Sequence, residues 1–182
     1  MNELILSKLE VANFNANYAS VGSVPRALLG DYTGLSVGTP SVGSNANTLV
    51  ANQVNLQTYT GAAALTSTLP AATAGVVVVL VITEDPAGGV NTMTIDCAGS
   101  DAFRTGSVIP TTSSNKMAYD VSAAGETSIV FTPTNDTVNF LSYDSTFVFS
   151  CVEAGLWNVN VNAKADIGVT AGAATGTLLF AS

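Results

Sequence analysis

The sequence predicts an all-β protein: a β-sandwich or jelly-roll-like antiparallel domain with an extended N-terminal arm. Hydrophobic residues make up 47% of the chain but charged residues only 10%, and exposed helix faces need far more Glu, Lys and Arg. From about residue 47 onward, turn residues separate short β-like runs at regular intervals. An unbroken valine-rich run at residues 76–82 is too short to span a bilayer and suits a buried strand.

Residues 1–45 are expected to form the arm and residues 46–182 the sandwich. Gly, Ser, Asn and Pro recur through the arm without a lasting period, so it cannot bury enough apolar area to fold alone. Its large apolar side chains are nevertheless too many for a solvated linker. We therefore expect the arm to order on another surface, either its own domain or a neighbouring subunit. The candidate contact residues are Phe14, Tyr18, Leu28, Leu29 and Tyr32.

Residues 69–97 organise the predicted core. The β-branched side chains of residues 76–82 fit a pleated strand covered on both faces. A turn rich in Pro and Gly follows, and residues 91–97 then alternate between apolar and polar types. We expect this second run to be the partner strand of the first, and the pair to form the centre of the core.

Shorter runs complete the predicted domain. Strands at 49–58 and 62–69 precede the central pair, and residues 99–119 look like a long exposed loop with a short strand around Val108. Beyond it the links between runs are short, which favours an antiparallel meander. No repeat at solenoid spacing is visible. The later strands are expected at 128–132, 138–144, 146–153 and 156–163, with a closing strand at 178–181.

The strand at 156–163 has two different faces. Trp157 and the valines that follow it share one face, which we expect to point into the core. Asn158, Asn160 and Asn162 share the other face. This asparagine row could bind sugar, face solvent or contact another subunit through amide hydrogen bonds. A structural use is favoured because no aromatic platform lies beside the row.

Signatures of catalysis and metal binding are missing from the sequence. The chain has no histidine, which removes a Ser-His-Asp triad, a Cys-His pair and most zinc sites. Phosphate-binding glycine motifs are also missing. We therefore expect no enzyme, no cofactor and no resident metal. Paired carboxylates, which suffice for a glycosidase, are the one route to catalysis left open.

Asp96 and Asp101 flank the tetrapeptide CAGS and are the first candidates for paired carboxylates or a weak calcium site. Thirteen acidic residues in a chain of this length produce such neighbours by chance, and turn preferences account for several of them. Cys97 and Cys151 fall in predicted strands, and we expect them to be buried small hydrophobes. A bridge between them would require neighbouring strands.

The charge pattern bears on partners and location. The net charge is −8 and the five basic residues are scattered, whereas binding to phosphate backbones or anionic membranes needs clustered Lys and Arg. Neither nucleic acid nor a membrane is expected as a partner. The first ten residues lack the apolar core of a secretory signal, so we expect the chain to stay in the cytosol until it is used. A surface this poor in charge is expected to be covered by copies of itself or by a larger assembly.

Two segments carry a resemblance to a viral family. They are TLPAATAGVVVVLVITEDPAGGVNTMTIDCAGSDAFRTGSVI at 68–109 and STFVFSCVEAGLWNVN at 145–160. The sequence is similar to small capsid-associated proteins of tailed bacteriophages, in particular the decoration, or cement, proteins of marine and cyanobacterial phages. The shared motifs, LPAA-x-AG and GG-x-NTMTI, are packing and turn signals.

The resemblance implies a virion structural protein made in the host cytoplasm. It implies a sandwich or jelly roll, a homotrimer, and a seat on the outer capsid surface between subunits of the major capsid protein, where it would stabilise the shell. The arm would then reach across to the major capsid protein. The alternative is a tail-fibre or baseplate β-module that binds a receptor or glycan through exposed aromatic side chains, which residues 99–119 could supply.

Overall fold

The structure is a computed structural model that describes residues 36–37, 46–57, 64–83, 92–113, 116–133, 141–164 and 176–182. These residues form strands and no helix, which confirms the all-β prediction. The predicted arm lies outside the described residues except for β1 (Ser36–Val37). Its contact candidates Phe14, Tyr18, Leu28, Leu29 and Tyr32 therefore stay a prediction.

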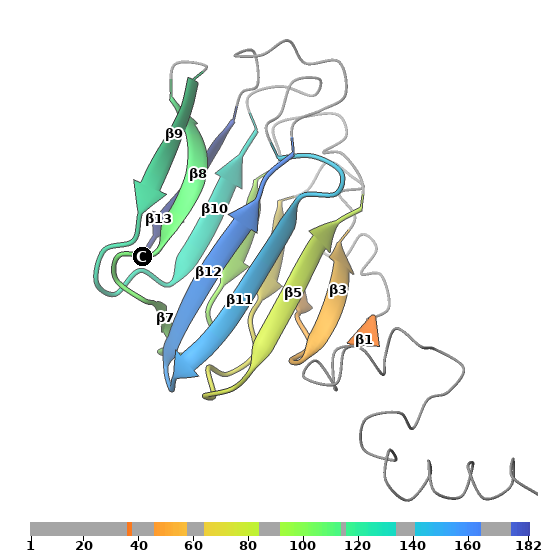
Figure 1. Ribbon diagram of the computed structural model, residues 1–182, viewed down its shortest axis with the longest axis vertical. Coiled ribbons are helices and arrows are strands. Elements are labelled where there is room, and N and C mark those ends of the chain that lie inside the picture. The colour runs from red at the N-terminus through yellow and green to blue at the C-terminus, as the bar shows by residue number, and fades with distance from the viewer. Residues whose placement is uncertain are drawn as a thin grey trace, which may run out of the picture. The chain divides into compact units, whose positions relative to one another are not determined.

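Two mixed sheets and a hairpin make up the described domain (Figure 1). Sheet A has six strands in the order β1-β3-β5-β11-β12-β7, and sheet B has five in the order β13-β10-β6-β4-β2. Strands β8 and β9 pair only with each other. After β1, the strands are β2 (Ala46–Thr48), β3 (Gln53–Gln57), β4 (Leu65–Thr68), β5 (Val77–Ile82), β6 (Met93–Asp96), β7 (Ala102–Phe103), β8 (Val108–Ser113), β9 (Lys116–Val121), β10 (Ser128–Thr132), β11 (Thr146–Glu153), β12 (Leu156–Asn162) and β13 (Thr177–Ala181).

The inner faces of the two sheets share one hydrophobic core. Sheet A contributes Phe147 and Phe149 from β11 and Trp157 from β12, and all three are fully buried. Sheet B contributes Met93 from β6 and Phe131 from β10, which are also fully buried. Burying one such side chain stabilises the fold by about 1.5–3 kcal/mol. The two layers and their common core agree with the coarse prediction of a sandwich-like fold.

The first half of the described chain winds between the two sheets. Strands β2, β4 and β6 lie in sheet B while β3 and β5 lie in sheet A. Each return to a sheet runs in the same direction as before, so β4 pairs in parallel with β2 and β6, and β3 with β1 and β5. Strand β7 also pairs in parallel, with β12. The prediction of an antiparallel domain is therefore wrong for these strands, because a period of two shows which face is buried and not which strand lies alongside.

The two runs predicted to be partner strands lie in different sheets. β5 pairs with β3 and β11, whereas β6 pairs with β4 and β10. The two strands pack into the core from opposite sides. Coverage of β5 on both faces was also wrong in part: Val78, Leu80 and Ile82 are fully buried, but the alternate valines are only half-buried.

Residues 99–119, predicted to be a long exposed loop with a short strand around Val108, contain β7, β8 and most of β9. The strand is confirmed, since β8 begins at Val108, but most of the loop is wrong. In the β8–β9 hairpin, Val108 lies opposite Val121 and Pro110 opposite Tyr119. Pro110 and the polar residues after it conceal this hairpin in the sequence, yet a strand at the edge of a sheet tolerates proline. The hairpin lies along the free edge of β13, where the side chains of Thr111 and Asp120 accept the backbone N–H groups of Leu178 (3.0 Å) and Phe180 (2.7 Å).

The C-terminal strands follow the prediction closely. β10 and β11 have the predicted bounds, β12 ends one residue earlier, and the antiparallel hairpin between β11 and β12 is confirmed. β13 covers the predicted closing strand. Of the strand predicted at 138–144, residues 138–140 lie outside the described residues, and residues 141–144 hold a turn rather than a strand.

A glycine contact tests the packing of β10 against the end of β13. Gly176 has a φ of +104°, and a Cβ there would lie 2.9 Å from Cε2 of the buried Phe131 ring. Gly176→Ala is therefore expected to lower the free energy of unfolding by about 2–4 kcal/mol, from backbone strain plus overpacking.

Gly75→Ala is the matched control for this substitution. Gly75 has a φ of +92°, but its Cβ would meet nothing within 4 Å, so only the strain of about 1–2 kcal/mol remains. Urea unfolding of both variants measures the difference. Equal losses would contradict the described contact between Gly176 and Phe131.

Candidate functional site

The two acids proposed for catalysis or calcium binding make structural hydrogen bonds. Asp101 Oδ2 accepts the N–H of Ala72 at 2.7 Å, which links the loop before β5 to the loop before β7. Asp96 Oδ1 accepts the hydroxyl of Ser128 at 2.7 Å, across the neighbouring strands β6 and β10. Within the described ranges, no three His, Cys, Asp or Glu side chains gather in a group that could hold a metal ion.

Cys97 and Cys151 are both buried and unbridged. Burial, with smaller contributions from the nearby Asp101 and Asp96, raises the pKa of Cys97 from 9.0 to about 12. Burial also raises the pKa of Cys151. The thiolate is the reactive form of cysteine, so neither side chain is poised as a nucleophile. The expectation that both act as small buried hydrophobes is confirmed.

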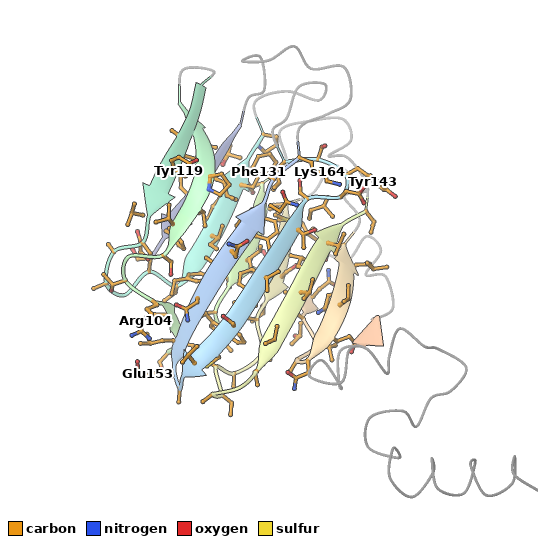
Figure 2. All side chains as sticks on the ribbon, in the orientation of Figure 1. Arg104, Tyr119, Phe131, Tyr143, Glu153 and Lys164 are labelled. Atoms are coloured by element: carbon orange, nitrogen blue, oxygen red, sulfur yellow. The ribbon has the colours of Figure 1, made fainter. Side chains whose placement is uncertain are left out.

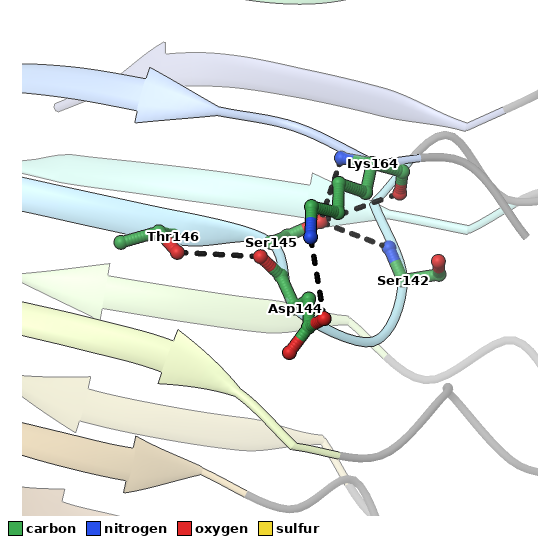
Figure 3. A network of polar contacts seen from close by, with 5 residues as sticks. All are labelled: Ser142, Asp144, Ser145, Thr146 and Lys164. Atoms are coloured by element: carbon green, nitrogen blue, oxygen red, sulfur yellow. Dashed lines mark hydrogen bonds and ion pairs between the residues drawn. The ribbon is translucent and has the colours of Figure 1, made fainter.

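A group containing serine, lysine and aspartate lies where β11 begins and β12 has ended (Figure 3). Ser145 Oγ accepts the N–H groups of Lys164 (3.0 Å) and Ser142 (3.2 Å) and donates to the Lys164 carbonyl (3.3 Å). The amine of Lys164 lies 3.2 Å from Asp144 Oδ2. Backbone groups thus hold the fully buried hydroxyl, while Asp144 holds the exposed amine. The group fastens two chain segments together and is not a Ser-Lys nucleophile.

The β8–β9 hairpin exposes an apolar strip, which we define as Val108, Pro110, Tyr119 and Val121. The cross-strand pairs place all four side chains on one face of the hairpin. Val108 is 50% exposed, Val121 55% and Tyr119 72%, and Figure 2 shows Tyr119 on this hairpin. The opposite face carries the buried Ile109 and Thr111. Exposed apolar groups that gather in one place mark interaction sites, whereas single ones are ordinary.

The outer face of sheet A is a second unusual surface. It carries a valine field across three neighbouring strands, which we define as Val54 and Leu56 of β3, Val77, Val79 and Val81 of β5, and Val148 of β11. Apart from Val148, which is 36% exposed, these side chains are half-buried. The asparagine row of Asn158, Asn160 and Asn162 borders the field on β12, on the face predicted for it.

Sequence reasoning thus located the asparagine row but missed the apolar strip and the valine field. The strip could have been found from the alternation of Tyr119 and Val121 with Asp120, which is typical of a strand with two different faces. The valine field could not, because a continuous apolar run is equally typical of a strand buried on both faces.

Comparisons with known proteins add no relative: no protein family, curated protein or solved structure matches this chain. None of the described segments forms a helix that is long and apolar enough to cross a membrane. The surfaces and bonds described above are therefore the basis for inferring a function.

Ser145→Ala is expected to lower the free energy of unfolding by about 1–3 kcal/mol, because it leaves the Lys164 N–H without its acceptor in a buried place. Lys164→Met is the control. It removes only the ion pair between half-exposed side chains, so its loss should stay below about 1 kcal/mol. Denaturant unfolding compares the two, and a larger loss in the lysine variant would contradict the assigned roles.

Because the pKa of Cys97 is raised, the free energy of unfolding is expected to fall at alkaline pH. The folded state keeps this proton up to a pKa of about 12, while an ordinary thiol releases it near 9.0. Between these values the unfolded chain binds fewer protons than the folded one, so the free energy of unfolding falls by up to about 1.4 kcal/mol per pH unit. Cys97→Ala should flatten that slope in unfolding experiments above pH 9.0. Parallel slopes in the variant and the natural chain would argue against the buried thiol as the cause.

Proposed function

We propose that this chain is a virion structural protein, a capsid decoration protein that binds between major capsid subunits and stabilises the shell. The apolar strip on the β8–β9 hairpin is the observation that carries the proposal. It presents Val108, Tyr119 and Val121 together, at exposed fractions of 50%, 72% and 55%. Clustered apolar side chains around an exposed aromatic ring are typical of protein-binding surfaces, where such rings dominate the binding energy.

The composition and the sequence resemblance support the same assignment. Charged residues make up only 10% of the chain, which suits a protein covered by neighbours better than one alone in solution. The resemblance of residues 68–109 and 145–160 to phage decoration proteins adds the outer capsid surface as location and the major capsid protein as partner. On this proposal the sandwich is a jelly-roll variant with parallel pairs, and the protein assembles as a homotrimer after synthesis in the host cytoplasm.

Mass action is the proposed mechanism of stabilisation. A protein that binds the assembled shell but not its separate subunits shifts the equilibrium toward the shell. The β8–β9 hairpin is suited to this task because its inner face is anchored to β13 while its outer face stays available. Several copies bound as one oligomer would add avidity without any further contact.

The alternative is a tail-fibre or baseplate module that binds a receptor or glycan. Tyr119 favours it, because the ring is 72% exposed at the end of the stretch expected to supply such an aromatic. A tyrosine ring offers an apolar face to a sugar ring and a hydroxyl for hydrogen bonding.

Co-sedimentation with purified capsid shells tests the proposal. The natural chain should sediment with expanded or unexpanded shells, and Tyr119→Asp should raise the dissociation constant by about tenfold or more, equivalent to about 1.4 kcal/mol. Thr48→Asp, which adds the same charge at an exposed position of sheet B, should bind like the natural chain.

Two results would count against the decoration role. One is a failure of the natural chain to sediment with either form of the shell. The other is binding to a glycan array that Tyr119→Ala abolishes, which would favour the tail-fibre module instead.

A further inference from the structure

We propose that the outer face of sheet A is an interface between two copies of this chain, related by two-fold symmetry. The face combines the valine field on β3, β5 and β11 with the asparagine row on β12. This inference goes beyond the proposed function, because it needs neither a shell nor the apolar strip. A two-fold contact is compatible with the proposed homotrimer, since it would pair two trimers.

The side chains of the valine field lie directly opposite one another across neighbouring strands. Val79 of β5 lies opposite Val54 of β3 on one side and Val148 of β11 on the other. Val148 in turn lies opposite Asn160 of β12. One row therefore crosses four strands, from three valines to an asparagine. Such a surface suits face-to-face packing against a second sheet, in which side chains from both faces interdigitate.

The absence of charge on this face points to another copy as its occupant. Among the residues of β3, β5, β11 and β12, only Glu153 is charged; it lies at the end of β11 and pairs with Arg104 at 3.3 Å. The chain as a whole carries a net charge of −8. Two copies repel each other through most of their surfaces, and an uncharged face lets them approach without that cost.

The asparagine row makes the face complementary to itself. In a two-fold arrangement with its axis along the row of Val79 and Asn160, each strand lies over its own counterpart, so valines meet valines and amides meet amides. A side-chain amide both donates and accepts hydrogen bonds, so Asn160 can pair with its copy. A row of carboxylates or amines could not pair with itself in this way. Interfaces of two-fold dimers require this self-complementarity.

Chemical cross-linking at Asn160 tests the arrangement. The axis brings position 160 of one copy opposite position 160 of the other, but facing sheets lie about 10 Å apart, beyond the Cα separation of about 7 Å that a disulfide can span. Asn160→Cys should therefore form covalent dimers with a short bismaleimide linker and not by oxidation. Cys97 and Cys151 should contribute little because they are buried.

Leu179→Cys is the matched control for the cross-link. Leu179 is 43% exposed on the outer face of sheet B, so its thiol is accessible but should give no dimer above the random background. Light scattering over a concentration series provides the second measurement. Val79→Asp should give particles with half the mass measured for the natural chain. Asn160→Asp replaces an exposed side chain with one of similar shape, so it should halve the particle mass without affecting folding. Leu179→Asp should leave the mass unchanged.

The outcomes decide the proposal separately from the decoration role. A cross-link at position 160 together with a halved mass in Asn160→Asp supports the interface, whether or not the chain binds shells. No excess cross-linking at position 160 over position 179, or a mass unchanged in Asn160→Asp, overturns it. Tyr119→Asp leaves the face intact and should affect shell binding alone.

Discussion

Burial of side chains between the two sheets is the interaction on which the rest of the structure depends. Leu80 and Phe149 come from neighbouring strands of sheet A, Ile95 and Phe131 come from sheet B, and none of them retains exposed area. Strands that are far apart in sequence are held together by this core, because parallel pairs such as β4 and β6 cannot be joined by a tight turn.

Side-chain alternation made much of the second half of the fold predictable. β10 and β11 were located to the residue, and the inward direction of Trp157 followed from its place in the alternation. The first half was less predictable because its strands change sheets at every step. No local sequence pattern indicates such a change. Asn55, for example, donates from its amide to the backbone carbonyls of Val50, Gln53 and Val79, yet in the sequence it looks like an ordinary strand residue.

The candidate site was predictable only where polar residues marked it. Asn158, Asn160 and Asn162 stand out because they recur at every second position of a strand, and they lie on the face expected. The acids Asp96 and Asp101 stood out equally, but one oxygen of each accepts a structural hydrogen bond, from Ser128 and Ala72 respectively. An apolar surface gives no such signal, since the same valines serve equally well inside a protein. Their exposure depends on which strands lie above them, and that is a property of the whole fold.

The bonds from Leu178 and Phe180 to the side chains of Thr111 and Asp120 limit how sheet B can be extended. An open sheet edge invites another strand and then another, without any built-in end point. Here that border is occupied by the chain's own hairpin, so sheet B cannot lengthen there into a fibre. The proposed two-fold contact uses a broad face of the molecule instead, and such a contact is complete once a single neighbour has docked.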